Sequence, residues 1–296
     1  MSIYEDVFKP QSFDEYVGQE KAKAIIEVMT DAAEAEERYY PNFLLTGTAG
    51  LGKTSLAKLI VGPLSHRFID GTLANSVLDE LRNFVIIDEI HNMKPEACDK
   101  MNLMIDNQKI IVMGCTTNPG ALPGPFRSRF QIINLVPYTE QQLTQIMRNV
   151  VERKGSLEIA DEYLEQIAVR GRETPRTVLK YLSFFIDLMV TRKEDIASQQ
   201  TLDDSFEMLG VDERGLLDID RQYLDALPLS TPVGIGYLTA VLAQDKETIE
   251  QEIEPYLLHL GLIDRTPKGR VRISDEDADI DHQVEELFTE SWLPSI

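Results

Sequence analysis

A glycine-rich loop between an apolar strand and an apolar helix is the first chemical signal in the sequence. It satisfies the pattern G-x-x-x-x-G-K-[ST] and ends in Lys53 and Thr54. Small residues let backbone N–H groups converge on phosphate oxygens, and the start of the following helix adds positive potential. We therefore expect Lys53 to contact the β- and γ-phosphates of a nucleotide, and the Thr54 hydroxyl to bind magnesium. The other predicted cradle residues are Gly47, Gly50, Leu51, Gly52 and Ser55.

A carboxylate pair follows a second apolar run. Asp88 and Glu89 come directly after residues 84–87, and Asp88 lies 35 positions beyond Lys53. The carboxyl ends of parallel strands meet at one edge of a sheet, where ligands bind in open α/β folds. Asp88 is therefore predicted to complete the magnesium site, and Glu89 to polarise the attacking water. Together these residues predict Mg²⁺-dependent hydrolysis of ATP.

Further polar groups come later in the chain. Thr117 lies in a polar cluster that could orient the water or sense the γ-phosphate, or could simply end a strand before Pro119. Arg127 and Arg129 could be surface charge, although phosphoryl transfer gains most from an arginine delivered by a neighbouring subunit. Arg176 begins a helix, where a cation opposes the helix dipole, so it is predicted to serve a ligand.

The elements that must position these groups form an α/β domain. The apolar runs at 42–46, 84–88 and 110–116 are each too short for a helix, and they alternate with helix-patterned segments. This order is typical of a parallel sheet covered on both faces. We expect this first domain to span residues 1–138.

An all-helical domain is predicted at 139–209. Strand-like runs stop after Tyr138, and Thr139 with Gln142 forms the pattern of a capping box. A helix is expected from there towards Gly155, a second at about 161–170, and a third beginning at Pro175.

Residues 210–273 predict a winged helix. Three helices are expected at 218–227, about 234–243 and 245–260, followed by two short strands joined across a turn that contains Lys268. The expected third helix is rich in glutamate, which repels phosphates, so the hairpin is the predicted DNA contact. Its cations are Arg265, Lys268, Arg270 and Arg272. With no aromatic platform among them, they should bind backbone phosphates regardless of sequence; a solvated basic turn is the alternative.

The remainder, 274–296, has eight acids and no Lys or Arg. Such a run is typical of a solvated tail, and the functional alternative is a partner-binding peptide that ends in Trp292 and Leu293. We expect the tail to be either a solubiliser or the contact for a protein partner.

Composition narrows the possible functions. The 296 residues are 43% hydrophobic, enough for several cores, and the formal net charge of −21 makes any nucleic-acid contact local. Cys98 and Cys115 stand alone, without the spacing of a disulfide framework or a zinc site. No apolar run approaches the roughly 20 residues that span a bilayer, and acids stand where a signal peptide is basic. We expect a cytoplasmic protein with no membrane association.

Taken together, the motifs resemble AAA+ ATPases and, at closer range, the RuvB family of Holliday junction branch migration motors. The resemblance runs to Ile273, and the final winged-helix segment favours RuvB over clamp loaders. The residues that carry it are Glu15-Tyr16-Val17-Gly18-Gln19, Gly50-Leu51-Gly52-Lys53-Thr54, Ile87-Asp88-Glu89-Ile90-His91, Gly114-Cys115-Thr116-Thr117, Arg127-Ser128-Arg129-Phe130, Thr174-Pro175-Arg176 and Arg265-Thr266-Pro267-Lys268-Gly269-Arg270.

The resemblance implies a fold and a set of roles. The fold is an AAA+ P-loop parallel-sheet domain, a small all-helical lid and a C-terminal winged helix. Phe8 and Lys9 would pack on the nucleotide base, although the family usually has Arg at the second position. The other implied roles are Thr117 as first sensor, Tyr138 as a nucleotide contact, Arg176 as second sensor, Arg127 or Arg129 as arginine finger, and Arg265 and Arg270 as DNA contacts.

The resemblance also implies an ATP-dependent DNA helicase in a hexameric ring that moves double-stranded or branched DNA in recombination or repair. This sequence departs from the RuvB family in a feature that concerns the protein partner RuvA. The 28 residues from Asp88 to Thr116 leave room for a single helix, at about 95–105, and not for the β-hairpin that docks RuvA. We therefore expect independence from a RuvA-type adaptor. The alternatives are a clamp-loader-like ATPase that remodels a protein partner and an ATP-dependent regulatory switch.

Overall fold

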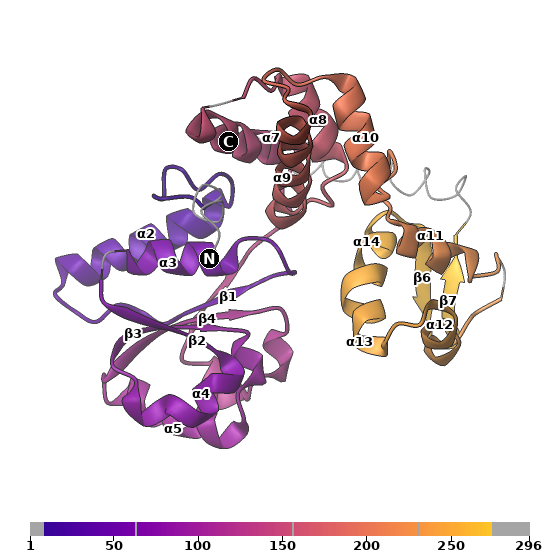
Figure 1. Cartoon of the computed structure of the whole chain (residues 1–296). Coiled ribbons are helices and arrows are strands. Elements are labelled where there is room, and N and C mark those ends of the chain that lie inside the picture. The colour runs from indigo at the N-terminus through magenta and orange to yellow at the C-terminus, as the bar shows by residue number, and fades with distance from the viewer. Residues whose placement is uncertain (1–8, 63, 156, 230, 274–296) are drawn as a thin grey trace, which may run out of the picture. The chain divides into compact units, whose positions relative to one another are not determined.

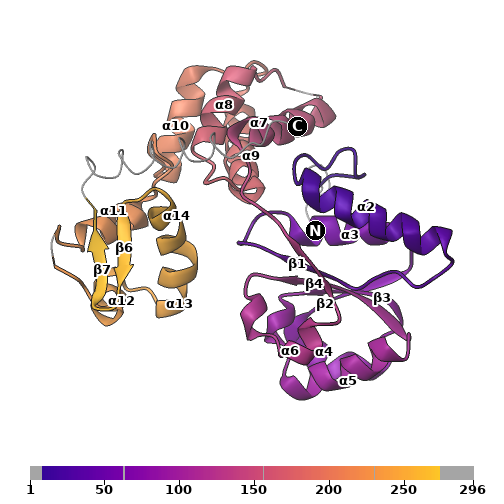
Figure 2. The same cartoon turned by 180° about the vertical axis from the view of Figure 1, so that it is seen from behind.

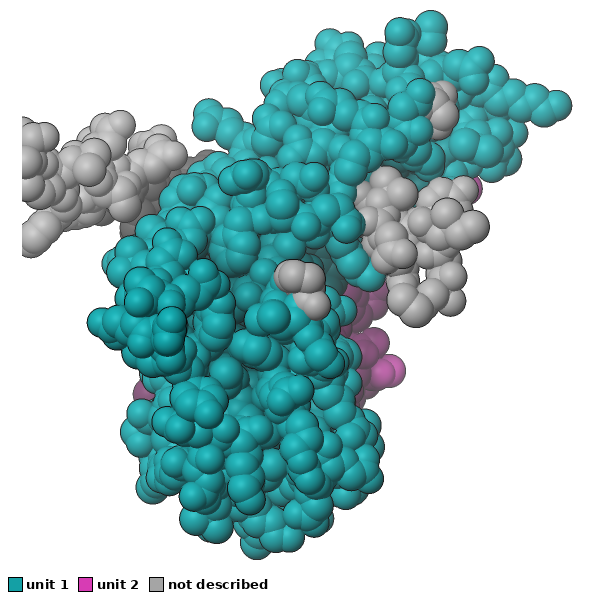
Figure 3. Space-filling view, turned by 90° about the vertical axis from the view of Figure 1, so that its left-hand side faces the viewer, with its two compact units in different colours: residues 1–202 teal, residues 203–296 magenta. Residues whose placement is uncertain are grey.

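The computed structural model describes residues 9–62, 64–155, 157–229 and 231–273. They form two compact units that divide between Leu202 and Asp203, and Figure 3 shows one face of the first unit in teal. Phe8 and the acidic tail at 274–296 lie outside the described residues. In the described part, no helix is both long enough and apolar enough to cross a lipid bilayer.

The first unit contains a five-stranded sheet in the order β2-β3-β4-β1-β5, with every neighbouring pair parallel. The central strands are continuous apolar runs because both of their faces are covered, and all four residues of β1 are buried. Its strands are β1 (Phe43–Thr46), β2 (His66–Asp70), β3 (Asn83–Asp88), β4 (Ile110–Thr116) and β5 (Gln131–Asn134).

Helices cover both faces of this sheet. In Figures 1 and 2, α2 and α3 lie over one face, and α4 and α5 lie over the other. The core beneath α4 and α5 includes Val85 and Ile87 of β3 and Met101 of α5. The bounds are α2 (Glu20–Ala35), α3 (Lys53–Val61), α4 (Gly71–Val77), α5 (Pro95–Asp106) and α6 (Gly124–Arg127), with 3₁₀ turns at Leu78–Glu80, Ile90–Asn92 and Pro119–Ala121.

The interval between β3 and β4 holds one 3₁₀ turn and α5. All of these residues are described, and none of those at 89–109 is in a strand. The predicted single helix is therefore confirmed, and this interval carries no hairpin.

Four further helices follow the sheet: α7 (Glu140–Lys154), α8 (Asp161–Val169), α9 (Pro175–Arg192) and α10 (Gln199–Leu209). The start of α7 has the predicted capping box, in which Thr139 Oγ1 accepts the Gln142 N–H at 3.2 Å and the Gln142 side chain accepts the Thr139 N–H at 3.1 Å. The sequence did not predict α10. The division between the two units falls inside this helix.

The second unit is a winged helix. Helices α11 (Asp218–Asp225) and α12 (Ile235–Leu242) precede a third helical segment, which consists of α13 (Lys246–Thr248), one π-helical turn (Ile249–Ile253) and α14 (Glu254–His259). The wing is the antiparallel pair β6 (Ile263–Thr266) and β7 (Gly269–Arg272), seen beside α11 and α12 in Figure 2. Leu238, Ile249 and Leu257 are among the residues of its core.

Candidate functional site: a nucleotide site and a basic wing

The glycine-rich loop joins β1 to the first turn of α3. Its last glycine, Gly52, has φ 89°, a conformation that side chains with a Cβ rarely adopt. A Cβ built at this position would lie 2.8 Å from the Tyr16 hydroxyl oxygen. The loop can therefore close against Tyr16 only because position 52 is glycine.

Lys53 lies inside this loop. Its side chain is buried, and Nζ donates to the carbonyl oxygens of Gly47 and Thr48, each at 2.9 Å. Burial lowers the pKa of Lys53, while the carboxylates of Glu89 and Asp88 act in the opposite direction. Among the described residues, the hydrogen bonds of this buried ammonium go to carbonyl oxygens of the loop, and such a cation gains from an anion, so the site fits a phosphate group.

The predicted magnesium residues lie in contact. Thr54 Oγ1, in the first turn of α3, donates to Asp88 Oδ2 at the end of β3 over 3.0 Å. A hydroxyl and one carboxylate are oxygen ligands, and Mg²⁺ is usually held by one or two carboxylates together with phosphate oxygens and water. The donor set therefore fits Mg²⁺ bound with a nucleotide.

Glu89 follows Asp88 at the same edge of the sheet, with φ 45° and ψ 49°. Its carboxylate is half-buried, and the Thr117 hydroxyl lies 3.5 Å from Oε2. His91 Nδ1 lies closer to the same oxygen, at 3.2 Å. The structure thus brings together Glu89 and Thr117 as predicted, and adds His91, to which the sequence assigned no role.

A cavity of about 80 Å³ lies on the other side of the loop. The predicted nucleotide contacts Gly52, Ser55 and Tyr138 line it. Tyr16, Asn149 and Arg153 are among the lining residues to which the sequence assigned no role. Mixed apolar and polar walls of this kind suit a flat heterocyclic base.

Two buried tyrosines of the cavity wall contact each other and the loop. Hydroxyls of both Tyr16 and Tyr138 lie 3.3 Å from the carbonyl oxygen of Leu51, and 3.3 Å from each other. Burial raises the pKa of both tyrosines, which keeps the hydroxyls protonated as donors. Arg153 Nη1 donates to the Lys9 carbonyl oxygen at 2.7 Å, so the segment that begins at Lys9 is attached to α7.

Arg176 lies beside the loop at the start of α9. Its backbone N–H donates to the Gly50 carbonyl oxygen at 3.4 Å. Its positive charge is one of the influences that lower the pKa of Lys53. The predicted second sensor is thus close to the phosphate cradle in the same chain.

Arg127 and Arg129 make other contacts. Arg127 Nη1 donates to the Pro119 carbonyl oxygen at 3.2 Å. Arg129 makes a bidentate pair with Asp106, with Nε 2.9 Å from Oδ1 and Nη2 2.7 Å from Oδ2. Hydrogen bonding to Arg129 lowers the pKa of Asp106, so the pair stays charged at neutral pH.

The wing arginines are bound to glutamates of the third helical segment. Glu254 is fully buried, and it accepts from Arg265 Nε at 2.5 Å and from Arg270 Nε at 2.9 Å. Tyr223 donates its hydroxyl to the same carboxylate at 2.8 Å, and Glu250 pairs with Arg270 Nη2 at 2.6 Å. The predicted DNA contacts at 265 and 270 therefore already serve as partners of a buried carboxylate.

The other two wing cations differ from each other. Arg272 Nη1 donates to the Leu224 carbonyl oxygen at 3.2 Å and lies 3.9 Å from Asp225 Oδ1. Lys268 is exposed in the turn between β6 and β7, and its ammonium has no ion-pair partner in the described part of the chain.

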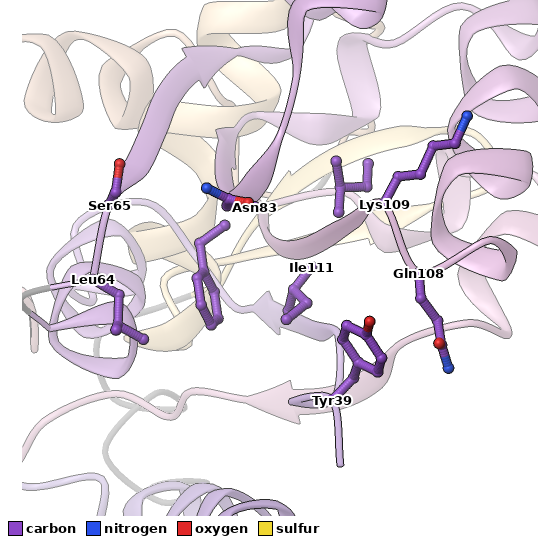
Figure 4. Close-up of a pocket in the computed structure, with 9 residues that line it drawn as sticks. Tyr39, Leu64, Ser65, Asn83, Gln108, Lys109 and Ile111 are labelled. Carbon is purple, nitrogen blue, oxygen red and sulfur yellow. The ribbon is translucent and has the colours of Figure 1, made fainter. Parts of the chain in front are cut away.

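A second hollow, of about 310 Å³, lies at the amino ends of β3 and β4, the edge of the sheet opposite Asp88 and Thr116. Figure 4 shows Tyr39, Asn83, Gln108 and Lys109 around it. None of the residues predicted to bind nucleotide lines this hollow.

Comparison with known proteins decides the family. The model of the Holliday junction DNA helicase RuvB P-loop domain matches residues 8–106, and that of the RuvB C-terminal winged helix domain matches residues 213–276. RuvB of Campylobacter lari, a Holliday junction branch migration complex subunit, is 32% identical over 90% of this chain and 89% of its own length. The chain belongs to the RuvB family.

Other RuvB proteins agree with this assignment. RuvB of Campylobacter fetus is 33% identical over 91% of this chain and 88% of its own length. The Thermotoga maritima RuvB Holliday junction branch migration motor matches in structure with a TM-score of 0.83 and 29% identity, over 93% of this chain and 98% of that one.

RuvB membership confirms the predicted AAA+ P-loop fold, the winged helix, and ATP with Mg²⁺ as the cofactors. This RuvB family member is thus a P-loop ATPase, and the buried Lys53 and the Thr54–Asp88 contact give it the chemical groups of one.

Proposed function

We propose that this RuvB family member is an ATP-driven DNA motor that translocates or branch-migrates double-stranded or branched DNA. The contact between Thr54 and Asp88 carries the proposal, because it joins the phosphate loop to the end of the strand that Glu89 directly follows. A winged helix in the same chain supplies a DNA-binding module. As a DNA motor of recombination or repair, the protein would act in the cytoplasm.

Each group in the nucleotide site has one task. Lys53 neutralises phosphate charge, and Thr54 and Asp88 would hold Mg²⁺, which supplies further charge neutralisation on the phosphate oxygens. Glu89 accepts the Thr117 hydroxyl through Oε2, which also lies near His91 Nδ1, and its carboxylate can polarise a water molecule for attack. Thr117, directly after β4, and Arg176, in the first turn of α9, would sense the γ-phosphate. Tyr138 and Ser55 would face the nucleotide from the neighbouring cavity.

Two variants test this assignment. Lys53→Ala should weaken nucleotide binding, because it removes the buried cation of the loop. Glu89→Gln should leave binding intact and lower turnover by about 10²- to 10⁴-fold, because an amide cannot polarise water. Hydrolysis at the parental rate by Glu89→Gln would show that Glu89 is not the base.

The arginines at 127 and 129 support a homo-oligomer. Their hydrogen bonds go to the Pro119 and Pro125 carbonyl oxygens and to Asp106, and not to the nucleotide site of their own chain. An arginine finger from one of them would therefore act on the site of an adjacent protomer, in a ring that we propose to be hexameric.

The wing is the proposed DNA contact. The ion pairs of its four cations indicate how free each one is to bind a DNA phosphate. Lys268 is fully available, and the Arg265 side chain is 42% exposed although it binds Glu254. Arg270 is only 14% exposed and holds two glutamates, so its main task would be to fix the wing. Arg272 would help to attach β7 to the last turn of α11.

The affinity of variants for DNA duplexes of unrelated sequence tests which of these cations contact DNA. Lys268→Ala should weaken binding to all sequences alike and reduce the salt slope by about one unit, the effect of losing one phosphate contact. Arg272→Ala is the matched control on the same hairpin and should change the slope less. Equal slopes for Lys268→Ala and the parent would exclude Lys268 as a DNA contact.

The missing hairpin favours a second candidate, a clamp-loader-like ATPase or a regulatory switch whose partner is a protein. A fork assay separates the two. A DNA motor separates or migrates the strands of forked DNA when ATP is added, whereas a protein-remodelling ATPase hydrolyses ATP and leaves the fork intact.

A further inference from the structure

The turn that carries Glu89 packs against the first turn of α4. A Cβ on Gly71 would lie 2.3 Å from the Glu89 carbonyl oxygen, so the backbone of Glu89 occupies the space of a side chain at 71. Asn75, one turn later, accepts the Lys94 N–H at 2.8 Å and lies 3.4 Å from the Asn92 carbonyl oxygen. These contacts fix the main chain at Glu89 and in the residues that follow it, and Glu89 is in a left-handed conformation unusual for a residue with a side chain.

The backbone contacts do not fix the carboxylate, and the side chain of His91 contacts it directly. His91 Nδ1 lies 3.2 Å from Glu89 Oε2 and 2.9 Å from Thr116 Oγ1. Thr116 is fully buried at the carboxyl end of β4, and its Oγ1 also accepts the Asn118 N–H at 3.0 Å. His91 therefore joins the expected base to the adjacent strand of the sheet.

The chemistry of the three groups sets the direction of the bond. A carboxylate can only accept hydrogen bonds, so a favourable contact with Glu89 requires the hydrogen to be on Nδ1 of His91. The hydrogen bond of Nδ1 is with Thr116 Oγ1, at 2.9 Å, and Glu89 Oε2 lies beside the same nitrogen at the 3.2 Å distance of an ion pair. The Thr117 hydroxyl, at 3.5 Å, donates only a weak hydrogen bond to Oε2.

We propose that His91 is a positioning residue for ATP hydrolysis: Nδ1, hydrogen-bonded to Thr116 of β4, lies 3.2 Å from the Glu89 carboxylate and holds it in place. This inference rests on the proposed function, in which Glu89 polarises the attacking water. A base acts efficiently only when its orientation is fixed before reaction. Thr116, which anchors His91, is buried in β4 and lies one residue before Thr117, the predicted first sensor.

Two amide variants distinguish positioning from packing. The amide nitrogen of Asn can occupy the place of Nδ1, whereas that of Gln reaches the place of Nε2. We expect His91→Gln and His91→Leu to lower kcat by about 10- to 100-fold, the usual cost of losing an orienting partner. His91→Asn should stay within about threefold of the parent. The KM for ATP and the affinity for a fluorescent ATP analogue should change less than about twofold throughout.

A double-mutant cycle completes the test. In a Glu89→Gln background, His91→Leu should have no further effect on turnover, because the carboxylate that it orients is gone. Equal kcat values for His91→Gln and His91→Asn, or a full additional loss in the double variant, would overturn the inference. A parent protein that hydrolyses ATP, with His91 variants that all match it, would overturn the inference and leave the proposed function standing. A parent without Mg²⁺-dependent hydrolysis would overturn both.

Discussion

Replacing Glu254 should destabilise the winged helix more than replacing any other acid of its third helical segment. The carboxylate is fully buried, and three donors, Arg265, Arg270 and Tyr223, converge on it within 2.9 Å. Burial and the hydrogen bond to Glu254 raise the pKa of Tyr223, so its hydroxyl remains a donor. Glu254→Ala would remove the acceptor from all three groups at once.

The loss of stability depends on whether each donor finds another partner, or water, once the Glu254 carboxylate is removed. Breaking a buried ion pair by removing one partner typically costs about 3 to 5 kcal/mol. Arg265 is 42% exposed and can turn to water, and Arg270 keeps Glu250 at 2.6 Å. We therefore expect the lower end, a loss of about 3 kcal/mol in the free energy of unfolding. For a unit of this size, that loss lowers the melting temperature by roughly 12 to 24 °C.

Calorimetry of the full chain, with hydrogen exchange of amides in β6 and β7, measures this loss. Glu252→Ala is the matched control, because Glu252 is exposed on the same helical segment, and it should change stability by less than about 0.5 kcal/mol. If Glu254→Ala unfolds within about 1 kcal/mol of the parent, the carboxylate does not fix the wing. Arg265 and Arg270 would then be available as DNA contacts, as the resemblance implied.

Three further outcomes are expected. Gly71→Ala forces a Cβ to within 2.3 Å of the Glu89 carbonyl oxygen, so it should lower kcat at least tenfold while nucleotide affinity is kept; unchanged turnover would show that the Glu89 turn tolerates displacement. Arg129→Ala should lose part of the roughly 10³- to 10⁵-fold contribution of an arginine finger, and mixing it with inactive Lys53→Ala should restore some ATPase activity if sites are shared; no recovery would mean that each chain works alone. Pull-down with the full chain and with a truncation after Ile273 should capture no RuvA-like protein with either form, and a partner lost on truncation would assign the acidic tail to protein binding.

Much of the fold could be predicted because its elements have strong local patterns. The runs that became β1, β3 and β4 are mostly apolar, since the middle residues of central parallel strands are buried on both faces. The strand β2 was missed for the opposite reason. It lies at the edge of the sheet, and of its residues, His66 to Asp70, only Ile69 is buried, while Phe68 is exposed and the other three are polar or charged. Edge strands of this kind lack the apolar signal on which a strand prediction depends.

The third helix of the winged domain shows a different limit of prediction from sequence: the helix was found, but not the irregular turn inside it. One helix was predicted from Asp245 to Leu260, and the Asp245 cap is present, with its Oδ1 accepting the Thr248 N–H at 2.9 Å. The segment is interrupted by a π-helical turn at Ile249–Ile253, just before Pro255. Proline lacks the N–H that would continue the regular ladder, and the wider turn precedes it.

The sequence by itself determined the phosphate loop, the Asp88–Glu89 pair, the order of the domains and the absence of a hairpin before β4, because each depends on residue type and spacing along the chain. Tertiary structure alone decided what the side chains contact. His91 meets Thr116 across 25 positions, and Arg270 meets Glu254 across 16, at distances set by how a turn packs on a strand and a hairpin on a helix. Such contacts have no periodic signal, because they depend on side-chain directions that are fixed only when the core has packed.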